Sequence, residues 1–161
     1  MIGETHDAVS FSAAMSAADT GHLVLSTLHT TNAAQAVGRT LDFFKPDERD
    51  QIRRQIAATL QAVVCQRMVN TINGSVTPAL EIMINTPTVK KLLEEGRLEK
   101  LPAAIETGIE DGMQNFNQAL YNLVKERKIT EKEALAKATN PQALEMNFKG
   151  IFLDEARRIL T

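Results

Sequence analysis

The stretch Thr20–Thr30, Thr-Gly-His-Leu-Val-Leu-Ser-Thr-Leu-His-Thr, decides the fold. Its apolar run Leu23–Leu25 predicts a strand buried on both faces, as in the parallel sheets of α/β proteins. Polar side chains follow this run, and open α/β sheets bind their ligands at the carboxyl ends of strands. Upstream, residues 1–4 have the pattern of a second buried strand that ends in the carboxylate of Glu4. We therefore expect Glu4 and His29 to share one edge of one sheet.

Capping residues and apolar stripes divide the remaining chain into short elements. Asp7, Asn32 with Gln35, Pro46 and Thr130 with Glu133 are typical of helix starts. The sequence predicts helices over 7–18, 32–44, 46–60, 87–95, 98–107, 114–127, 131–138 and, more weakly, 153–160. Strands are predicted over 62–71 and 76–84, on either side of a two-residue hairpin signal at Asn73-Gly74. The pattern predicts an α/β part up to about residue 85 and a helical part after it.

Two segments near the N-terminus resemble motifs of the bacterial secretion ATPases. Gly3-Glu4 with Asp7 resembles the Walker B motif, and residues 17–30 resemble the histidine box. Residues 112–120, Gly-Met-Gln-Asn-Phe-Asn-Gln-Ala-Leu, are similar to a segment of the type IV pilus retraction (twitching-motility) branch. The resemblance extends to about residue 130. It implies that residues 1–85 are the C-terminal part of a RecA-like P-loop ATPase core, a truncated sheet plus β-hairpin, and that residues 86–161 are a helical C-terminal subdomain.

The chain contains no P-loop. A P-loop has the pattern Gly-x-x-x-x-Gly-Lys-Ser/Thr, whose amides and lysine hold phosphates, and no such string occurs in the sequence. We interpret the chain as the C-terminal portion of a longer ATPase and predict that alone it neither turns over ATP nor binds it tightly. For the parent protein the resemblance implies ATP and Mg²⁺ as cofactors, a homo-hexamer, a pilus-base inner-membrane partner, and a cytoplasmic location at the inner membrane face.

Composition narrows the class of protein further. The net charge of −2 gives no bulk attraction to nucleic acid, so no nucleic-acid partner is predicted. No apolar run is long enough to span a membrane, and the single cysteine, Cys65, cannot form an internal disulfide. One cysteine also excludes a four-cysteine zinc site, and we predict no metal site in this chain. Pilus-extension and type II secretion ATPases commonly carry such a zinc module, so its absence favours the retraction branch.

Glu4 is the candidate catalytic residue. In the secretion ATPases the matching glutamate is thought to act on the water that attacks the γ-phosphate, a role that requires an acceptor which orients the water in line. The alternative is a solvated carboxylate at a strand end.

Residues of the histidine box are candidates for sensing the nucleotide. His29, with Thr27 and Thr30, can donate hydrogen bonds to a phosphate oxygen and respond to its loss. His22 lies seven residues before His29, about 20 Å along an extended strand, so the two cannot share one metal ion. His22 is a second candidate for phosphate sensing or a structural histidine. Arg39 is a candidate contact to phosphate or to a neighbouring subunit, or a solvated helical arginine.

The sequence departs from the family pattern at several positions. His6 and Val9 stand where the usual segment has arginine and glutamate, and residues 88–95 lack two arginines of the retraction branch. Two functions therefore stay open: a retraction ATPase that couples hydrolysis to pilin disassembly, or a non-catalytic scaffold or regulatory subunit of the pilus or type II secretion machinery. The apolar tail 140–161 is expected to pack on its own domain or on a partner.

Overall fold

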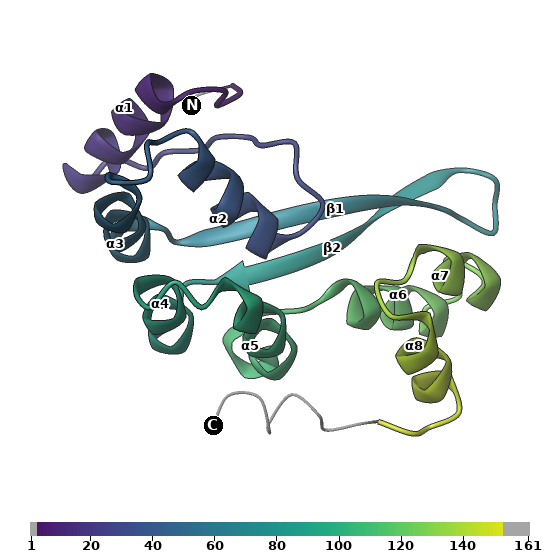
Figure 1. Cartoon of the computed structure of the whole chain (residues 1–161). Helices are drawn as coiled ribbons and strands as arrows, with labels where there is room; N and C mark the ends of the chain where they lie inside the picture. The colour runs from purple at the N-terminus through teal and green to yellow at the C-terminus, as the bar shows by residue number, and fades with distance from the viewer. Residues whose placement is uncertain (1–2, 153–161) are drawn as a thin grey trace. The chain divides into compact units, whose positions relative to one another are not determined.

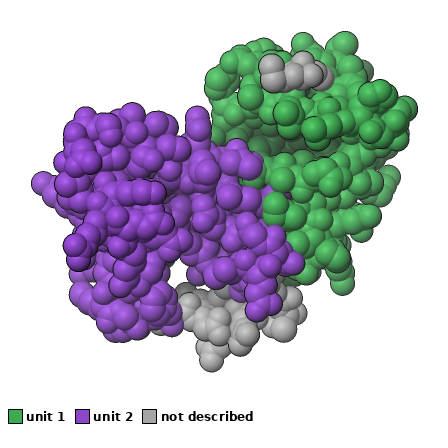
Figure 2. Space-filling view, turned by 180° about the vertical axis from the view of Figure 1, so that it is seen from behind, with its two compact units in different colours: residues 1–63, 84–101 green, residues 64–83, 102–161 purple. Residues whose placement is uncertain are grey.

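A computed structural model describes residues 3–152, with mixed α and β structure (Figure 1). The chain folds into two compact units, coloured separately in Figure 2. The first contains residues 3–63 and 84–101, and the second contains residues 64–83 and 102–152. The sequence analysis places a domain boundary after residue 85, between the ATPase core and the helical subdomain. That boundary stays a prediction.

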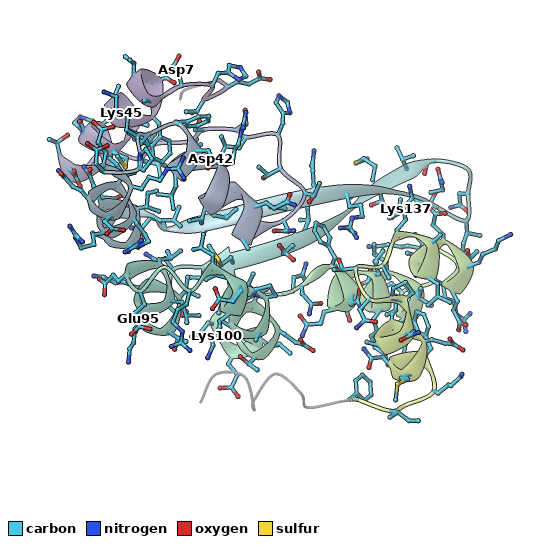
Figure 3. The ribbon with its side chains drawn as sticks, in the orientation of Figure 1. Asp7, Asp42, Lys45, Glu95, Lys100 and Lys137 are labelled. Carbon is cyan, nitrogen blue, oxygen red and sulfur yellow. The ribbon has the colours of Figure 1, made fainter. Side chains whose placement is uncertain are left out.

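The first unit is built from short helices. They are α1 (Ala8–Asp19), α2 (Ala33–Asp42), α3 (Arg49–Thr59), α4 (Pro87–Glu94) and the 3₁₀ helix η1 (Leu98–Lys100). Of these helices, α1, α2 and α4 have a side-chain cap. Asp7, at the start of α1 in Figure 3, accepts a hydrogen bond from the Ser10 amide at 2.8 Å, and Asn32 accepts one from the Gln35 amide at 2.8 Å. These side chains satisfy amides that have no partner within the helix, so α1 and α2 start where the sequence predicts.

The core of the first unit lies where α3 packs against α1 and α4. Its buried side chains are small or apolar: Met15, Ala33, Val37, Phe44, Ile56, Ala57, Val89, Leu92 and Leu93. The Phe11 ring of α1 lies 6.5 Å from the ring of Phe43 and 6.1 Å from that of Phe44, measured between ring centroids. Aromatic contacts therefore join α1 to the end of α2.

Three predictions for residues 32–107 are wrong in detail. Pro46 opens a turn and not a helix, and α3 begins at Arg49. The predicted helix 98–107 is two elements, η1 followed by α5 (Leu101–Thr107). The Gln35 side chain accepts hydrogen bonds from the amide and hydroxyl of Thr31, so it does not close the capping box on Asn32.

The strand predicted at Leu23–Leu25 is also wrong. This segment is extended, but its one bridge within the described residues joins Thr27 to Glu4, and Leu23 is 82 % and Leu25 58 % exposed. A strand buried on both faces needs neighbouring strands and a covering layer on each side. Within residues 3–152 no further strand pairs with this segment, so its apolar side chains remain in contact with solvent.

The second unit contains most of the β-hairpin, formed by β1 (Ala62–Asn70) and β2 (Val76–Ile84) as the sequence predicts. Cys65 and Val69 in β1 are buried between exposed neighbours, and Ala79 and Met83 in β2 are buried between neighbours that are exposed or half-buried. Burial, with a smaller contribution from Glu81, raises the pKa of the Cys65 thiol to about 11. The turn spans Thr71–Ser75, longer than the two residues predicted, and Gly74 adopts φ +79°.

Helices α6 (Phe116–Lys125), α7 (Glu131–Lys137) and α8 (Pro141–Phe148) complete the second unit, together with the 3₁₀ helix η2 (Ile109–Asp111). A full capping box formed by Asn115 and Gln118 opens α6. Helix α8 is not among the predicted helices. It begins at Asn140, which accepts a hydrogen bond from the Ala143 amide at 3.1 Å and is followed by a proline at the first helical position.

The described part of the tail packs on its own unit. Leu144 is fully buried, and the rings of Phe148 and Phe152 lie 5.7 Å and 5.8 Å from the ring of Tyr121. Self-packing, the first of the two alternatives, therefore holds for residues 140–152. The predicted helix 153–160 lies outside the described residues.

Within residues 3–152, no helix combines the length and the apolar character that crossing a membrane requires.

Candidate functional site

Two segments outside the helices, residues 3–6 and 26–30, are joined by one bridge in the first unit. Glu4 and Thr27 form a parallel bridge, and the Thr5 amide donates to the Thr27 carbonyl at 3.2 Å. The Thr27 hydroxyl donates to the Gly3 carbonyl at 2.5 Å, and the hydroxyls of Thr5 and Ser26 share a hydrogen bond. Backbone and hydroxyl contacts thus bring together residues more than twenty positions apart in sequence.

The carboxylate of Glu4 contacts two imidazoles. Its Oε2 lies 2.8 Å from Nε2 of His6, and its Oε1 lies 3.2 Å from Nε2 of His29. The two rings are nearly parallel, with an interplanar angle of 23° and centroids 6.5 Å apart. Of the two contacts, the one to His29 has hydrogen-bond geometry, and the Glu4 side chain is 49 % exposed.

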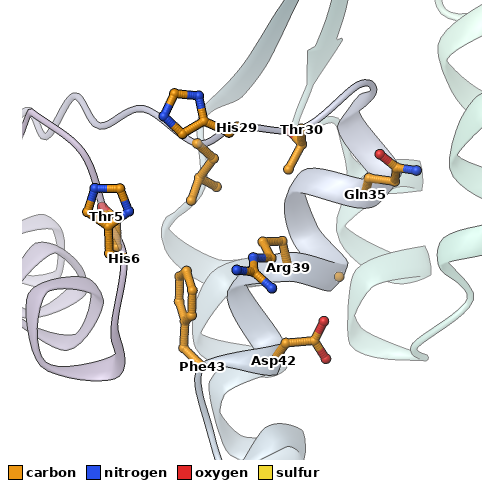
Figure 4. Close-up of a pocket in the computed structure, with 10 residues that line it drawn as sticks. Thr5, His6, His29, Thr30, Gln35, Arg39, Asp42 and Phe43 are labelled. Atoms are coloured by element: carbon orange, nitrogen blue, oxygen red, sulfur yellow. The ribbon is translucent and has the colours of Figure 1, made fainter.

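A cavity of about 510 Å³ adjoins the two histidines, and we call it the histidine pocket (Figure 4). It is lined by Thr5, His6, Leu28, His29, Thr30, Gln35, Gly38, Arg39, Asp42 and Phe43. In Figure 4, Arg39 extends from α2 into the space below the two imidazoles. Its guanidinium carbon lies 5.6 Å from the centre of the Phe43 ring, and Asp42 Oδ1 lies 3.5 Å from Nη2 of Arg49. Two imidazoles and a guanidinium therefore face one cavity.

The remaining predicted site residues have different surroundings. Thr30 lines the histidine pocket, whereas the Thr27 hydroxyl is taken up by the Gly3 carbonyl. His22 does not line the pocket, and its Nδ1 lies 3.1 Å from the Thr20 hydroxyl at the end of α1. That contact fits the alternative in which His22 is a structural histidine.

His6 was not predicted as a site residue, because it stood out in the sequence only as a departure from the family pattern. The sequence does contain a signal that places His6 beside Glu4. In an extended segment residues two apart point the same way, so Glu4 and His6 lie on one side of the chain.

The donor set of the site suits an anion more than a cation. Imidazole and guanidinium groups donate hydrogen bonds to phosphate and carboxylate oxygens. In the part of the chain that the structure describes, no group of three or more histidine, cysteine, aspartate and glutamate side chains is arranged to hold a metal ion. The arrangement can therefore bind an oxyanion and offers a carboxylate beside it.

Comparisons with known proteins show which family and fold the chain is similar to. The family model described as Type II/IV secretion system protein matches residues 1–147. The type IV pilus retraction ATPase PilT of Pseudomonas aeruginosa is 37 % identical over 142 residues, 88 % of this chain and 41 % of PilT. The type IV pilus ATPase PilU of the same organism is 37 % identical over 150 residues, 92 % of this chain and 39 % of PilU.

A solved structure extends the similarity to the fold. The crystal structure of the pilus retraction motor PilT with bound ADP matches with a TM-score of 0.78 and 32 % identity, covering 89 % of this chain and 40 % of that chain. The chain thus spans about two fifths of the length of these relatives. Its fold is the C-terminal part of a RecA-like ATPase core with a helical subdomain, as predicted. The extent of the family match shows that this chain belongs to the Type II/IV secretion system protein family.

Proposed function

We propose that this chain supplies the hydrolytic side of the ATP site in a type IV pilus retraction ATPase. The single observation that carries the proposal is the meeting of Glu4 and His29 beside a cavity lined by two imidazoles and the guanidinium of Arg39. The relatives named as retraction ATPases support the type of protein. In this proposal residues 3–6 act as the Walker B segment and residues 17–30 as the histidine box.

The pocket fits the phosphates of a nucleotide on chemical grounds. His29, Thr30 and Arg39 present donors to one cavity, the set that phosphate oxygens require. ATP, when bound, would supply a γ-phosphoryl group that water attacks, with ADP as the leaving group. Mg²⁺ is proposed as a cofactor of the whole protein, together with ATP.

Glu4 and His29 then act together in one step, the attack of water on the γ-phosphate. Glu4 accepts a hydrogen bond from the attacking water and orients it. His29 leaves the Glu4 carboxylate to donate to a phosphate oxygen, so the Glu4–His29 contact of 3.2 Å differs between the nucleotide-free and nucleotide-bound states. Arg39 adds a permanent positive charge to the pocket.

At the level of the whole protein, we propose a cytoplasmic homo-hexamer bound at the inner membrane face that drives pilin disassembly. The competing candidate is a non-catalytic scaffold or regulatory subunit. The replacement of an arginine and a glutamate of the family pattern by His6 and Val9 is the observation that favours it.

Glutamine at position 4 distinguishes these candidates. We expect Glu4→Gln in the whole protein to reduce ATP turnover by a hundredfold or more while ATP still binds, because the amide cannot accept the water proton. The measurement is steady-state phosphate release with a separate binding titration. The scaffold candidate is supported instead if the unaltered whole protein binds pilus components but releases no phosphate.

A further inference from the structure

We propose that Asn73, at the tip of the β-hairpin, is a site of spontaneous deamidation, and that the hydrogen bonds of the folded turn slow the reaction. The pair Asn73-Gly74 lies in the turn that joins β1 to β2 (Figure 1), and Asn73 is the one asparagine in the sequence that a glycine follows. Neither residue lines the histidine pocket, so this modification does not depend on the proposed function.

The reaction needs the chain and water alone. The Gly74 amide nitrogen loses its proton and forms a bond to Cγ of Asn73, while the side-chain nitrogen of Asn73 takes up a proton and leaves as ammonia. The product is a succinimide ring. Water then opens the ring at either carbonyl and leaves aspartate or isoaspartate at position 73. Water is consumed and ammonia is released in equal amounts, with no change of oxidation state.

The surroundings of Asn73 and Gly74 favour ring closure. Both residues are exposed, so water reaches the ring once it has formed. Glycine has no side chain beside the attacking nitrogen, and its backbone angles change at little cost. Asn122 on α6 differs in both respects, because Leu123 follows it and the helix fixes its backbone. Asn73 should therefore react faster than Asn122, although both are exposed.

The hydrogen bonds of the turn oppose the attack. The Gly74 amide donates to the Thr71 carbonyl at 3.1 Å, so the proton that must leave is held in a hydrogen bond. Thr71 in turn contacts Ser75, through its amide to the Ser75 carbonyl at 2.8 Å and between the two hydroxyls at 2.7 Å. Ring closure therefore requires local opening of the turn, and its rate follows the fraction of time that the turn is open.

Isoaspartate, one of the two products, changes the backbone of the turn. It routes the main chain through the side chain of residue 73 and so lengthens the path between Ile72 and Gly74. The Ile72 amide donates to the Lys128 carbonyl at 3.0 Å, which attaches the turn to the segment between α6 and α7. A longer main chain at position 73 displaces the residues on either side, so the isoaspartate form loses this attachment.

The test is incubation of the full 161-residue chain at mildly alkaline pH, followed by digestion and mass spectrometry. The peptide that contains Asn73 should gain the mass that exchange of an amide for a carboxyl adds, before any such gain occurs at Asn122. In urea that unfolds the chain, Asn73 should react about tenfold faster, since one or two hydrogen bonds hold the folded turn closed and about 1.4 kcal/mol corresponds to tenfold.

Two further comparisons assign the effect to the turn. Thr71→Val removes the hydroxyl contact to Ser75, so it should speed the reaction of the folded chain and leave the rate in urea unchanged. The matched control is Thr88→Val, at an exposed threonine of α4, which should change neither rate. The Ile72 amide should exchange its hydrogen faster in the isolated isoaspartate form than in Asn73→Asp, which has the same charge but the ordinary backbone.

A rate at Asn73 no higher than that at Asn122, in the folded chain and in urea, would overturn the assignment of the site. Equal rates at Asn73 in the folded and unfolded chain, or a Thr71→Val chain that reacts no faster when folded, would overturn the restraint by the turn. Equal exchange of the Ile72 amide in the isoaspartate form and in Asn73→Asp would overturn the loss of the contact to Lys128. None of these measurements involves ATP, so their outcome is separate from that of the proposed function.

Discussion

At the residue scale, the surroundings of Glu4 explain both what the sequence could predict and what it could not. Glu4 and His29 were expected at one edge because each follows an apolar run, and hydrogen bonds between the two segments do bring them together. The contact from His6 was not expected, because it depends on the rotamers of two exposed side chains. Spacing along the chain limits which residues can meet, but it does not determine side-chain conformation.

Also at the residue scale, the cap of α1 predicts a pH dependence. Hydrogen bonds from the amide and hydroxyl of Ser10 lower the pKa of Asp7 below its usual value. The ionised carboxylate is thus favoured in the folded state, and its contribution to stability is present above the ordinary aspartate pKa and lost as the pH falls through the lowered one. We expect Asp7→Ala to lower the melting temperature by a few degrees at pH 7.

The control for this prediction is Asp7→Asn, since asparagine caps helices about as well as aspartate without a titrating charge. Thermal melts from pH 7 down to pH 2 should show the difference between the unaltered chain and Asp7→Ala shrinking below about pH 4. The difference between Asp7→Asn and Asp7→Ala should stay constant. If the difference in melting temperature between the unaltered chain and Asp7→Ala stayed the same at every pH, the ionised Asp7 carboxylate would not be the source of the stabilisation.

At the element scale, the helix starts at Asp7, Asn32 and Thr130 were predicted correctly, whereas the strand at Leu23–Leu25 and helix α8 were not. Asp7, Asn32 and Thr130 satisfy backbone amides within three residues, so their effect is local and readable in sequence. Burial of Leu23–Leu25 depends on neighbours that residues 3–152 do not provide. Helix α8 was missed because its single buried leucine, Leu144, gives little periodicity, although Asn140 followed by Pro141 is itself a helix-start signal.

The attachment of α8 gives a prediction at this scale. Asn117, on α6, accepts hydrogen bonds from the Thr139 and Asn140 amides at 3.1 Å and 3.3 Å, and donates one to the Asn140 carbonyl at 2.7 Å. One side chain therefore holds α6 to the start of α8. We expect Asn117→Ala to lower the free energy of unfolding by about 1–2 kcal/mol, because these groups lose their partner. Urea unfolding followed by circular dichroism measures the change.

The matched control is Asn122→Ala, which removes an exposed asparagine from the same helix. Asn122→Ala should change the free energy of unfolding by no more than about 0.5 kcal/mol. Hydrogen exchange adds a local measurement, since the amides of residues 141–148 should exchange faster in Asn117→Ala than in the control. Equal destabilisation by the two variants would show that the contact to α8 contributes nothing beyond helix propensity.

At the scale of the whole molecule, the hairpin and the order of most helices could be predicted from the sequence. The sequence did not predict that each compact unit is made of two separate stretches of the chain. The helices and strands follow from local patterns, whereas the units mix residues 64–83 with residues beyond 101. Contacts such as Arg67 over the Phe116 ring, at 4.1 Å, join segments far apart in sequence. A single sequence carries no local signal for such contacts.

The central claim is that Glu4 and His29 act as one unit in ATP hydrolysis. The most direct measurement is a double-mutant cycle on turnover by the whole protein, with Glu4→Gln, His29→Gln, the double variant and His22→Gln as the control outside the pocket. If the two groups act together, the double variant should be about as slow as the slower single variant, and His22→Gln should turn over ATP at nearly the normal rate. Multiplicative losses from Glu4→Gln and His29→Gln, or turnover that neither variant reduces, would contradict the account.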